Sequence, residues 1–162
     1  MTIVTQPSEN GHSAGGPGTC TMGAITIVEG AGRRRAMSGD KRDILEVLKF
    51  ELAFLEQGGY GRSVRTPKTP TRIFQDSLSC INFCEPTRPQ PCNECFLSDF
   101  VPENAQSEDV PCHHIPLNPA GETADALRDN QLKLEEALEA WLRATIHRLE
   151  QERAAAAEPK NT

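Results

Sequence analysis

Large apolar side chains are scarce in this sequence. Aromatic residues make up 5% of its 162 residues, and hydrophobic residues of all kinds make up 37%. So few large side chains cannot fill an extended interior, and we expect an ordered region of about 100 residues with disordered ends. There is no run of about 18 apolar residues, so we expect no membrane span. We also expect a cytoplasmic protein, because Arg33, Arg34 and Arg35 are not followed by the apolar stretch of an export signal.

An excess of basic charge is also lacking. The formal net charge is −6, whereas proteins that bind nucleic acid or anionic membranes normally present a basic surface. The sequence shows no Ser-His-Asp spacing typical of a hydrolase, and "GGYG" is not followed by the lysine of a phosphate-binding loop. These absences favour a non-enzymatic protein that does not bind nucleic acid.

The chain divides by composition into three parts. Residues 1–37 are Gly-rich and bury too little surface to order themselves, so we expect a tail that is disordered or ordered only by a partner. Within this tail, "AITIVEG" is the one stretch with the character of a strand. Residues 38–153 form the expected single domain, and residues 154–162 form a frayed end.

The first element of the domain is an amphipathic helix expected at 40–57. Ser38 or Asp40 can cap its start, and Gly58 and Gly59 can end it. Apolar residues recur at helical spacing at Ile44, Leu45, Leu48, Leu52 and Leu55. Further apolar side chains flank this stripe, which predicts a helix that is well buried or shared with a partner.

A second amphipathic helix is expected at 125–156. Its apolar seam consists of Leu134, Leu138, Trp141, Leu142, Thr145, Ile146 and Leu149. Glu139 and Arg143 lie one turn apart and can form an ion pair. The seam predicts either packing against the chain's own domain or a contact between two copies, which would make a homo-oligomer.

Residues 60–119, between these helices, contain nine of the twelve prolines. Short apolar pieces such as "RIFQDSL", "INF", "ECFLSDFV" and "HIPL" are separated by Pro-rich stretches, which predicts brief strands and long loops. Segments of this size usually need disulfides or a metal ion for stability. The predicted fold class is therefore a small α+β domain: a metal-stapled, loop-rich module with short strands, flanked by an N-terminal and a C-terminal amphipathic helix.

Five of the six cysteines lie in this middle segment, in "CINFCEPTRPQPCNEC" and "VPCHHIPLN". Clustered thiols in a reducing compartment typically bind metal or perform redox chemistry. Cys92 and Cys95 have the spacing with which a single tight turn holds one metal ion. We predict a structural zinc site with four ligands: Cys80, Cys92, Cys95 and Cys112.

The spacing leaves this ligand set open. Cys84 can replace Cys80 after a modest adjustment of the loop. His113 or His114 can replace Cys112, because zinc also accepts an imidazole nitrogen. A histidine that does not bind the metal can still hydrogen-bond a thiolate ligand.

The metal and its role also have alternatives. The same thiols could hold an iron–sulfur cluster or exchange disulfides. A hydrolytic zinc site would need an open ligand position and a carboxylate base, for which Glu94 and Glu85 are the nearest candidates. We consider hydrolysis the weaker hypothesis, because thiolate ligands make zinc a poorer Lewis acid. Cys20 stands apart in the Gly-rich tail and is taken as incidental.

A basic stretch at 62–72 is a candidate partner surface. Prolines within it favour an extended chain, which presents Arg62, Arg65, Lys68 and Arg72. This stretch is either a solvated connector or a site for an acidic protein surface. We expect a protein partner, bound through the amphipathic helices or through this stretch.

Several stretches resemble a known group of proteins: "KFELAFLEQGGYGRSVRTP", "IFQDSLSCINF", "PCNEC", "VPCHHIPLN" and "WLRATIHRLE". They span residues 49–150 and are similar to short bacterial proteins associated with nickel–iron hydrogenase gene clusters. In that pattern Cys84 is a departure, whereas four cysteines belong to the motif: Cys80, Cys92, Cys95 and Cys112. The resemblance implies an accessory, scaffold or maturation role beside a hydrogenase or another redox complex.

Overall fold

The computed structural model describes residues 39–61 and 72–157 of the chain. The predicted tail with its strand, the basic stretch apart from Arg72, and the chain after residue 157 lie outside the described residues. Within the two described ranges, no helix combines the length and the apolar character needed to cross a membrane.

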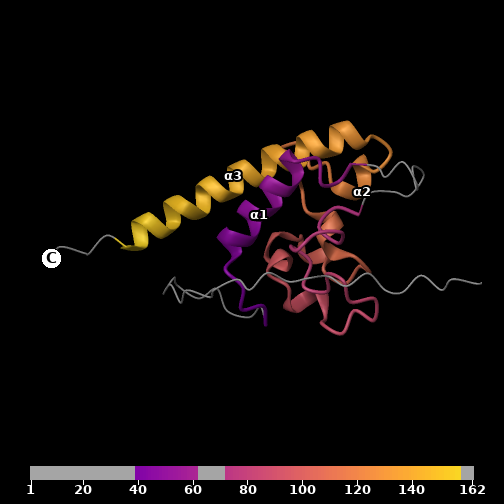
Figure 1. Ribbon diagram of the computed structural model, residues 1–162, viewed down its shortest axis with the longest axis horizontal. Coiled ribbons are helices and arrows are strands. Elements are labelled where there is room, and N and C mark those ends of the chain that lie inside the picture. Colours follow the sequence, from indigo (N-terminus) through magenta and orange to yellow (C-terminus); the bar gives the residue numbers. More distant parts are fainter. Residues whose placement is uncertain (1–38, 62–71, 158–162) are drawn as a thin grey trace, which may run out of the picture.

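Helices dominate the described residues (Figure 1). The α-helices there are α1 (Ile44–Glu56), α2 (Ala124–Leu127) and α3 (Gln131–Ala157). Short 3₁₀-helices lie between α1 and α2, namely η1 (Cys92–Glu94), η2 (Phe96–Phe100), η3 (Glu103–Ala105) and η4 (Pro111–His114). These ranges contain no strand, and their one β-type pairing is an isolated bridge between Pro116 and Thr123.

The predicted fold class, a metal-stapled α+β module with short strands, is therefore wrong. The described residues form a mostly helical structure, and no three or more His, Cys, Asp or Glu side chains among them are arranged to hold a metal ion. The pieces expected as strands form turns closed by local bonds, such as Phe83 N to Cys80 O at 3.2 Å. Proline explains the difference, because it lacks an N–H group and interrupts a strand before a partner can pair with it.

α1 begins and ends at residues with distinct physical roles. Asp43 caps its start, because the carboxylate accepts hydrogen bonds from two backbone N–H groups of the first turn at 2.9 and 3.3 Å. Of the predicted caps, Asp40 instead pairs with Arg42 at 2.7 Å, and Ser38 lies outside the described residues. Gly58 ends the helix with a φ of 73°, a left-handed conformation that costs glycine little.

The helix expected at 125–156 is two helices in the structure. The chain leaves the helical path between α2 and α3, and Asn130 starts α3 anew. Its side-chain oxygen accepts a hydrogen bond from Lys133 N at 3.1 Å, a capping role that asparagine favours over positions inside a helix. α3 then continues to Ala157, beyond the expected end of the domain at residue 153.

α1 and α3 pack against each other in antiparallel directions (Figure 1). Ion pairs fix their register, because the start of α1 meets the end of α3: the pairs are Asp43–Arg153, Lys49–Glu150 and Glu56–Arg143. The apolar residues that the two helices bury are Leu45, Leu48, Leu55, Leu134, Leu138, Leu142 and Ile146. Most of the seam predicted on the C-terminal helix is therefore buried within its own chain.

Trp141 joins α3 to the turn-rich middle segment. Its ring makes edge contacts with Phe74 and Phe100, with ring centroids 6.0 and 5.2 Å apart. Phe74 is fully buried, and Leu97 and Ile115 are almost as deeply buried in the same core. The middle segment thus packs on the long helix through aromatic and aliphatic side chains rather than through a sheet.

A buried carboxylate joins α1 to the same segment. Glu51 is 0% exposed, and it accepts hydrogen bonds from the hydroxyl groups of Tyr60, Ser77 and Ser79, the last two at 2.5 Å. The Tyr60 oxygen accepts in turn from the backbone N–H of Phe74 at 2.8 Å. Burial, and then the charge of Glu51, raises the pKa of Tyr60, so its hydroxyl stays protonated and donates. This network fixes the middle segment against α1.

Candidate metal centre

The four predicted cysteine ligands line one small cavity, which has a volume of about 20 Å³. All four are free thiols. Cys80 closes a turn that starts at Ser77, Cys92 and Cys95 flank η1, and Cys112 lies in η4. Three turns that are separate in the sequence therefore meet at this cavity.

η1 places Cys92 and Cys95 on the same side of the chain. A 3₁₀-helix has about three residues per turn, so side chains three positions apart point in the same direction. The turn is closed by hydrogen bonds from Glu94 N to Pro91 O at 3.0 Å and from Cys95 N to Cys92 O at 3.2 Å. Pro91 restricts the backbone that enters the turn. The five residues of "PCNEC" therefore suffice to place the two thiols side by side.

Asn82 closes the Pro-rich loop that separates Cys80 from Cys92. Its side-chain nitrogen donates to the carbonyl oxygen of Gln90 at 2.7 Å, and its side-chain oxygen accepts from the Gln90 N–H at 2.9 Å. Asn82 is 6% exposed, so these two bonds are largely shielded from water. The loop is folded back on itself, which brings the turn of Cys80 toward η1.

Backbone N–H groups donate to two of the thiols. The Asn82 N–H hydrogen-bonds Cys80, and the N–H groups of Ile81 and Leu97 hydrogen-bond Cys95. Such donors favour the thiolate, which is the form that binds metal. The same turns that position the sulfur atoms therefore also supply hydrogen bonds to them.

Two guanidinium groups flank the thiols. Arg88 Nη2 donates to Cys92 Sγ at 3.2 Å, and the charge of Arg42 acts on Cys95 and Cys80. Backbone carbonyl oxygens of the turn before Cys80 hold Arg42 in place. The sequence carried no signal for either arginine, because each reaches the thiols only through the way the loops fold.

Burial is the main influence on the acidity of the thiols. It raises the pKa of Cys80, raises that of Cys95 to about 11, and raises that of Cys112 furthest. The charges of the three other cysteines raise the pKa of Cys112 further, as expected for acidic groups that lie close together. These three thiols are therefore protonated at neutral pH unless a cation stabilises them as thiolates.

The thiols share a cavity without having the geometry of a coordination shell. In residues 39–61 and 72–157, no group of three or more His, Cys, Asp or Glu side chains is arranged to hold a metal ion. The volume of about 20 Å³ is close to the space that one water molecule needs. The fold thus brings four sulfur-bearing side chains around a space for one small atom.

The alternative ligands lie elsewhere. Cys84 neither lines this cavity nor is a free thiol. His113 lines a different cavity, and its Nε2 donates to the carbonyl oxygen of Ile73 at 3.1 Å. Burial lowers the pKa of His113, which keeps its ring neutral. The remaining candidates also lie off the thiol cavity: His114, Glu85 and Glu94.

Comparisons with known proteins do not assign the chain to a family. No protein-family model matches it, and no curated protein or solved structure does so. The proposals for function therefore depend on the residues and their geometry.

Proposed function

We propose that this chain is a non-enzymatic accessory protein that binds one structural zinc ion through four thiolates, those of Cys80, Cys92, Cys95 and Cys112. The observation that carries the proposal is that these four side chains, from three separate turns, line one cavity. Thiolate sulfur is a preferred ligand of zinc, and four thiolates complete its tetrahedral shell without leaving a position for a substrate. Zinc bound here would hold the turns of the middle segment together.

The surroundings of the cavity support a thiolate-rich site. Four thiolates and one divalent cation carry a net charge of minus two, and two guanidinium groups, those of Arg42 and Arg88, offset it. The N–H groups that donate to Cys80 and Cys95 act in the same direction, because hydrogen bonds to metal ligands orient and stabilise them.

The size and lining of the cavity favour a single ion over the alternatives. A space of about 20 Å³ suits one atom, whereas an iron–sulfur cluster contains several atoms. No Asp or Glu side chain of the described residues lines it, although hydrolysis at zinc normally uses a carboxylate base. Reversible disulfide formation between Cys92 and Cys95 is the redox alternative, and zinc binding would suppress it by occupying both thiolates.

We propose that the protein partner is a redox complex and that a hydrogenase is the leading candidate. The support is the resemblance of residues 49–150 alone. Binding of a purified nickel–iron hydrogenase to the immobilised full-length chain tests this assignment, and an absence of binding at micromolar concentration would contradict it. The homo-oligomer through the C-terminal helix stays a prediction.

Replacing a proposed ligand is expected to remove zinc from the protein. The Cys92→Ser and Cys112→Ser proteins should each contain far less than the roughly one zinc per chain expected of the natural sequence, because a serine hydroxyl is a poor zinc ligand. Cys84→Ser changes a cysteine that does not line the cavity, and this control should retain zinc. The zinc content of each protein is measured by mass spectrometry after purification without oxygen. Equal zinc in Cys84→Ser and Cys112→Ser would contradict the ligand set.

A further inference from the structure

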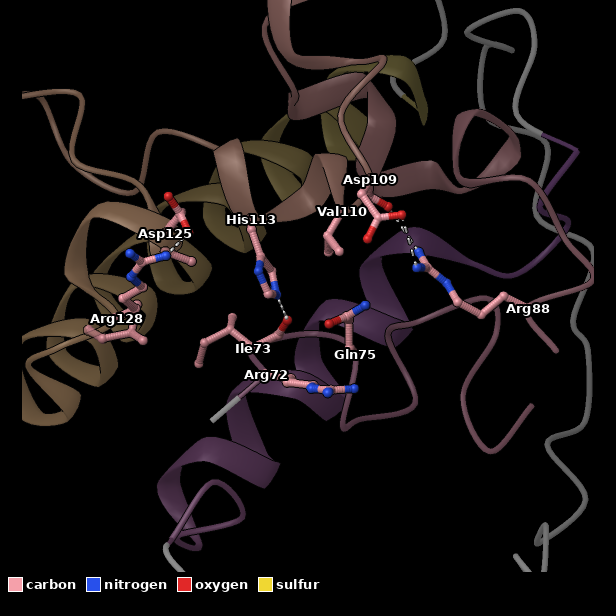
Figure 2. Close-up of a pocket in the computed structure, with 11 residues that line it drawn as sticks. Arg72, Ile73, Gln75, Arg88, Asp109, Val110, His113, Asp125 and Arg128 are labelled. Atoms are coloured by element: carbon pink, nitrogen blue, oxygen red, sulfur yellow. Dashed lines mark hydrogen bonds and ion pairs between the residues drawn. The ribbon is translucent and has the colours of Figure 1, made fainter. Parts of the chain in front are cut away.

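A second, larger cavity, drawn in Figure 2, shares lining residues with the thiol cavity. Its volume is about 310 Å³, at the lower end of the range of about 300–1,000 Å³ found for small-molecule sites. It is lined by residues of the turn at 72–75, of η4 and of both α2 and α3. Gln75, Arg88 and Val110 line both cavities, so the two spaces are neighbours.

The cavity carries an excess of positive charge. Three guanidinium groups line it, those of Arg72, Arg88 and Arg128, against two carboxylates, those of Asp109 and Asp125. This local excess occurs in a chain whose net charge is −6. Arg128 pairs with Asp125 at 3.2 Å, and Arg88 lies 3.8 Å from Asp109. Both aspartates are exposed, by 51% and 95%, so these ion pairs are weak and exchangeable.

Arg72 has a guanidinium group that is available to a ligand. Among the described residues it forms no hydrogen bond or ion pair through its side chain; its backbone N–H donates to the Asp76 carboxylate at 3.3 Å, and its carbonyl oxygen accepts from the Asp76 N–H at 3.0 Å. Figure 2 shows the Arg72 side chain below Gln75, with Arg128 on one side of the cavity and Arg88 on the other. Cationic groups thus approach the cavity from several directions.

We propose that this cavity binds a small phosphorylated molecule, with its phosphate at the guanidinium group of Arg72 and with Arg88 and Arg128 adding positive charge from the two sides of the cavity. A phosphate monoester carries about 1.5 to 2 negative charges at neutral pH, and the planar guanidinium group matches pairs of its oxygens. The organic part of the ligand would contact the apolar lining, which consists of Ile73, Val110, Ala124 and Leu134. The observations that carry this proposal are separate from those for zinc, although most of the lining lies in residues 72–119, the segment that zinc is expected to order.

Arg88 is the charged residue that lines both cavities. Its Nη2 donates to Cys92 Sγ and to the carbonyl oxygen of Asp109, each at 3.2 Å. A phosphate bound in the larger cavity would draw on the same guanidinium group as the thiol of Cys92.

Calorimetric titration of the full-length chain tests this proposal, with phenyl phosphate as the probe. We expect saturable binding of one molecule per chain, weaker binding of benzoate because of its single charge, and no binding of the neutral benzyl alcohol. An absence of saturable binding of phenyl phosphate in the millimolar range would overturn the site. Benzoate that binds as tightly as phenyl phosphate would overturn the phosphate assignment, and benzyl alcohol that binds equally well would overturn the role of charge.

Single substitutions identify the cavity as the place of binding. Arg72→Ala should weaken the binding of phenyl phosphate about tenfold or more, because it removes charge-assisted hydrogen bonds, and Arg128→Ala should weaken it less, because Arg128 adds positive charge from one side of the cavity. Arg148→Ala is the matched control, because it removes the same charge at a residue that does not line the cavity. Arg148 lies on α3 and pairs with Glu152. The affinity of this variant should be unchanged. The same loss of affinity in all three variants would show binding to net charge alone and would overturn the proposal.

Discussion

Chelating the proposed zinc ion is expected to unfold residues 72–119. In this segment the structure has 3₁₀-helices and turns but no strand, so few long-range backbone hydrogen bonds hold it together. Structural zinc in small domains contributes about 10–16 kcal/mol of binding free energy at neutral pH. This is comparable to the whole stability of a typical domain, about 5–15 kcal/mol, so the loss of the ion should remove the order of the segment.

The single tryptophan makes this unfolding measurable. Trp141 contacts Phe74 and Phe100, which both lie in the middle segment. Its fluorescence should shift to longer wavelength when a chelator removes zinc, and amide hydrogens of residues 72–119 should lose their protection from exchange. Addition of zinc, but not of magnesium, should restore both signals. Unchanged fluorescence and unchanged protection after complete removal of the metal would contradict a structural role for it.

Replacing Glu51 by Ala should be the most destabilising single substitution outside the cysteines. Glu51 is fully buried, and its carboxylate is the acceptor for the hydroxyl groups of Tyr60, Ser77 and Ser79. Glu51→Ala leaves these donors without their acceptor and opens a cavity. The free energy of unfolding should fall by about 3–5 kcal/mol, in the range seen when one partner of a buried polar network is removed.

Urea unfolding of matched variants measures this loss. Glu51→Gln keeps one acceptor oxygen and should lose less stability than Glu51→Ala. Glu46→Ala is the control on the same helix, because the Glu46 side chain is 68% exposed and lies 4.0 Å from Lys49. It should change the free energy of unfolding by less than about 0.5 kcal/mol. Equal stability of Glu51→Ala and Glu46→Ala would show that the buried network contributes nothing.

The helices were predictable because their signals are local. Leucines at helical spacing locate α1 within the range expected for it. Its start was missed, since Asp40 and Asp43 are equally good caps in sequence terms. The structure uses Asp43 for this role because Asp40 pairs with Arg42. Asn130 is likewise a local capping residue, and it marks the break between α2 and α3 that the long apolar seam concealed.

The predicted strands were wrong because strand formation depends on a partner. Pieces such as "INF" have the composition of a strand, but short pieces separated by prolines cannot form a ladder. Local hydrogen bonds satisfy them instead, as in the bond from Cys80 N to Ser77 O at 3.2 Å. Composition alone does not show which of these two outcomes a Pro-rich segment adopts.

The spacing of the cysteines predicted which residues to consider but not what surrounds them. Cys92 and Cys95 come together because the five residues 91–95 form a local turn. Cys80 and Cys112 reach the same cavity only through contacts between segments distant in the sequence. The roles of Arg88 and the buried Glu51 depend on contacts between distant segments. No pattern in a single sequence encodes such contacts.

The zinc content of the unsubstituted 162-residue chain, purified without oxygen, tests the central proposal most directly. Four thiolates around one small cavity predict about one zinc per chain in a colourless protein in which these four cysteines stay reduced. Metal far below this ratio in unoxidised protein, or visible absorbance that bleaches on reduction, would contradict a structural zinc site at Cys80, Cys92, Cys95 and Cys112.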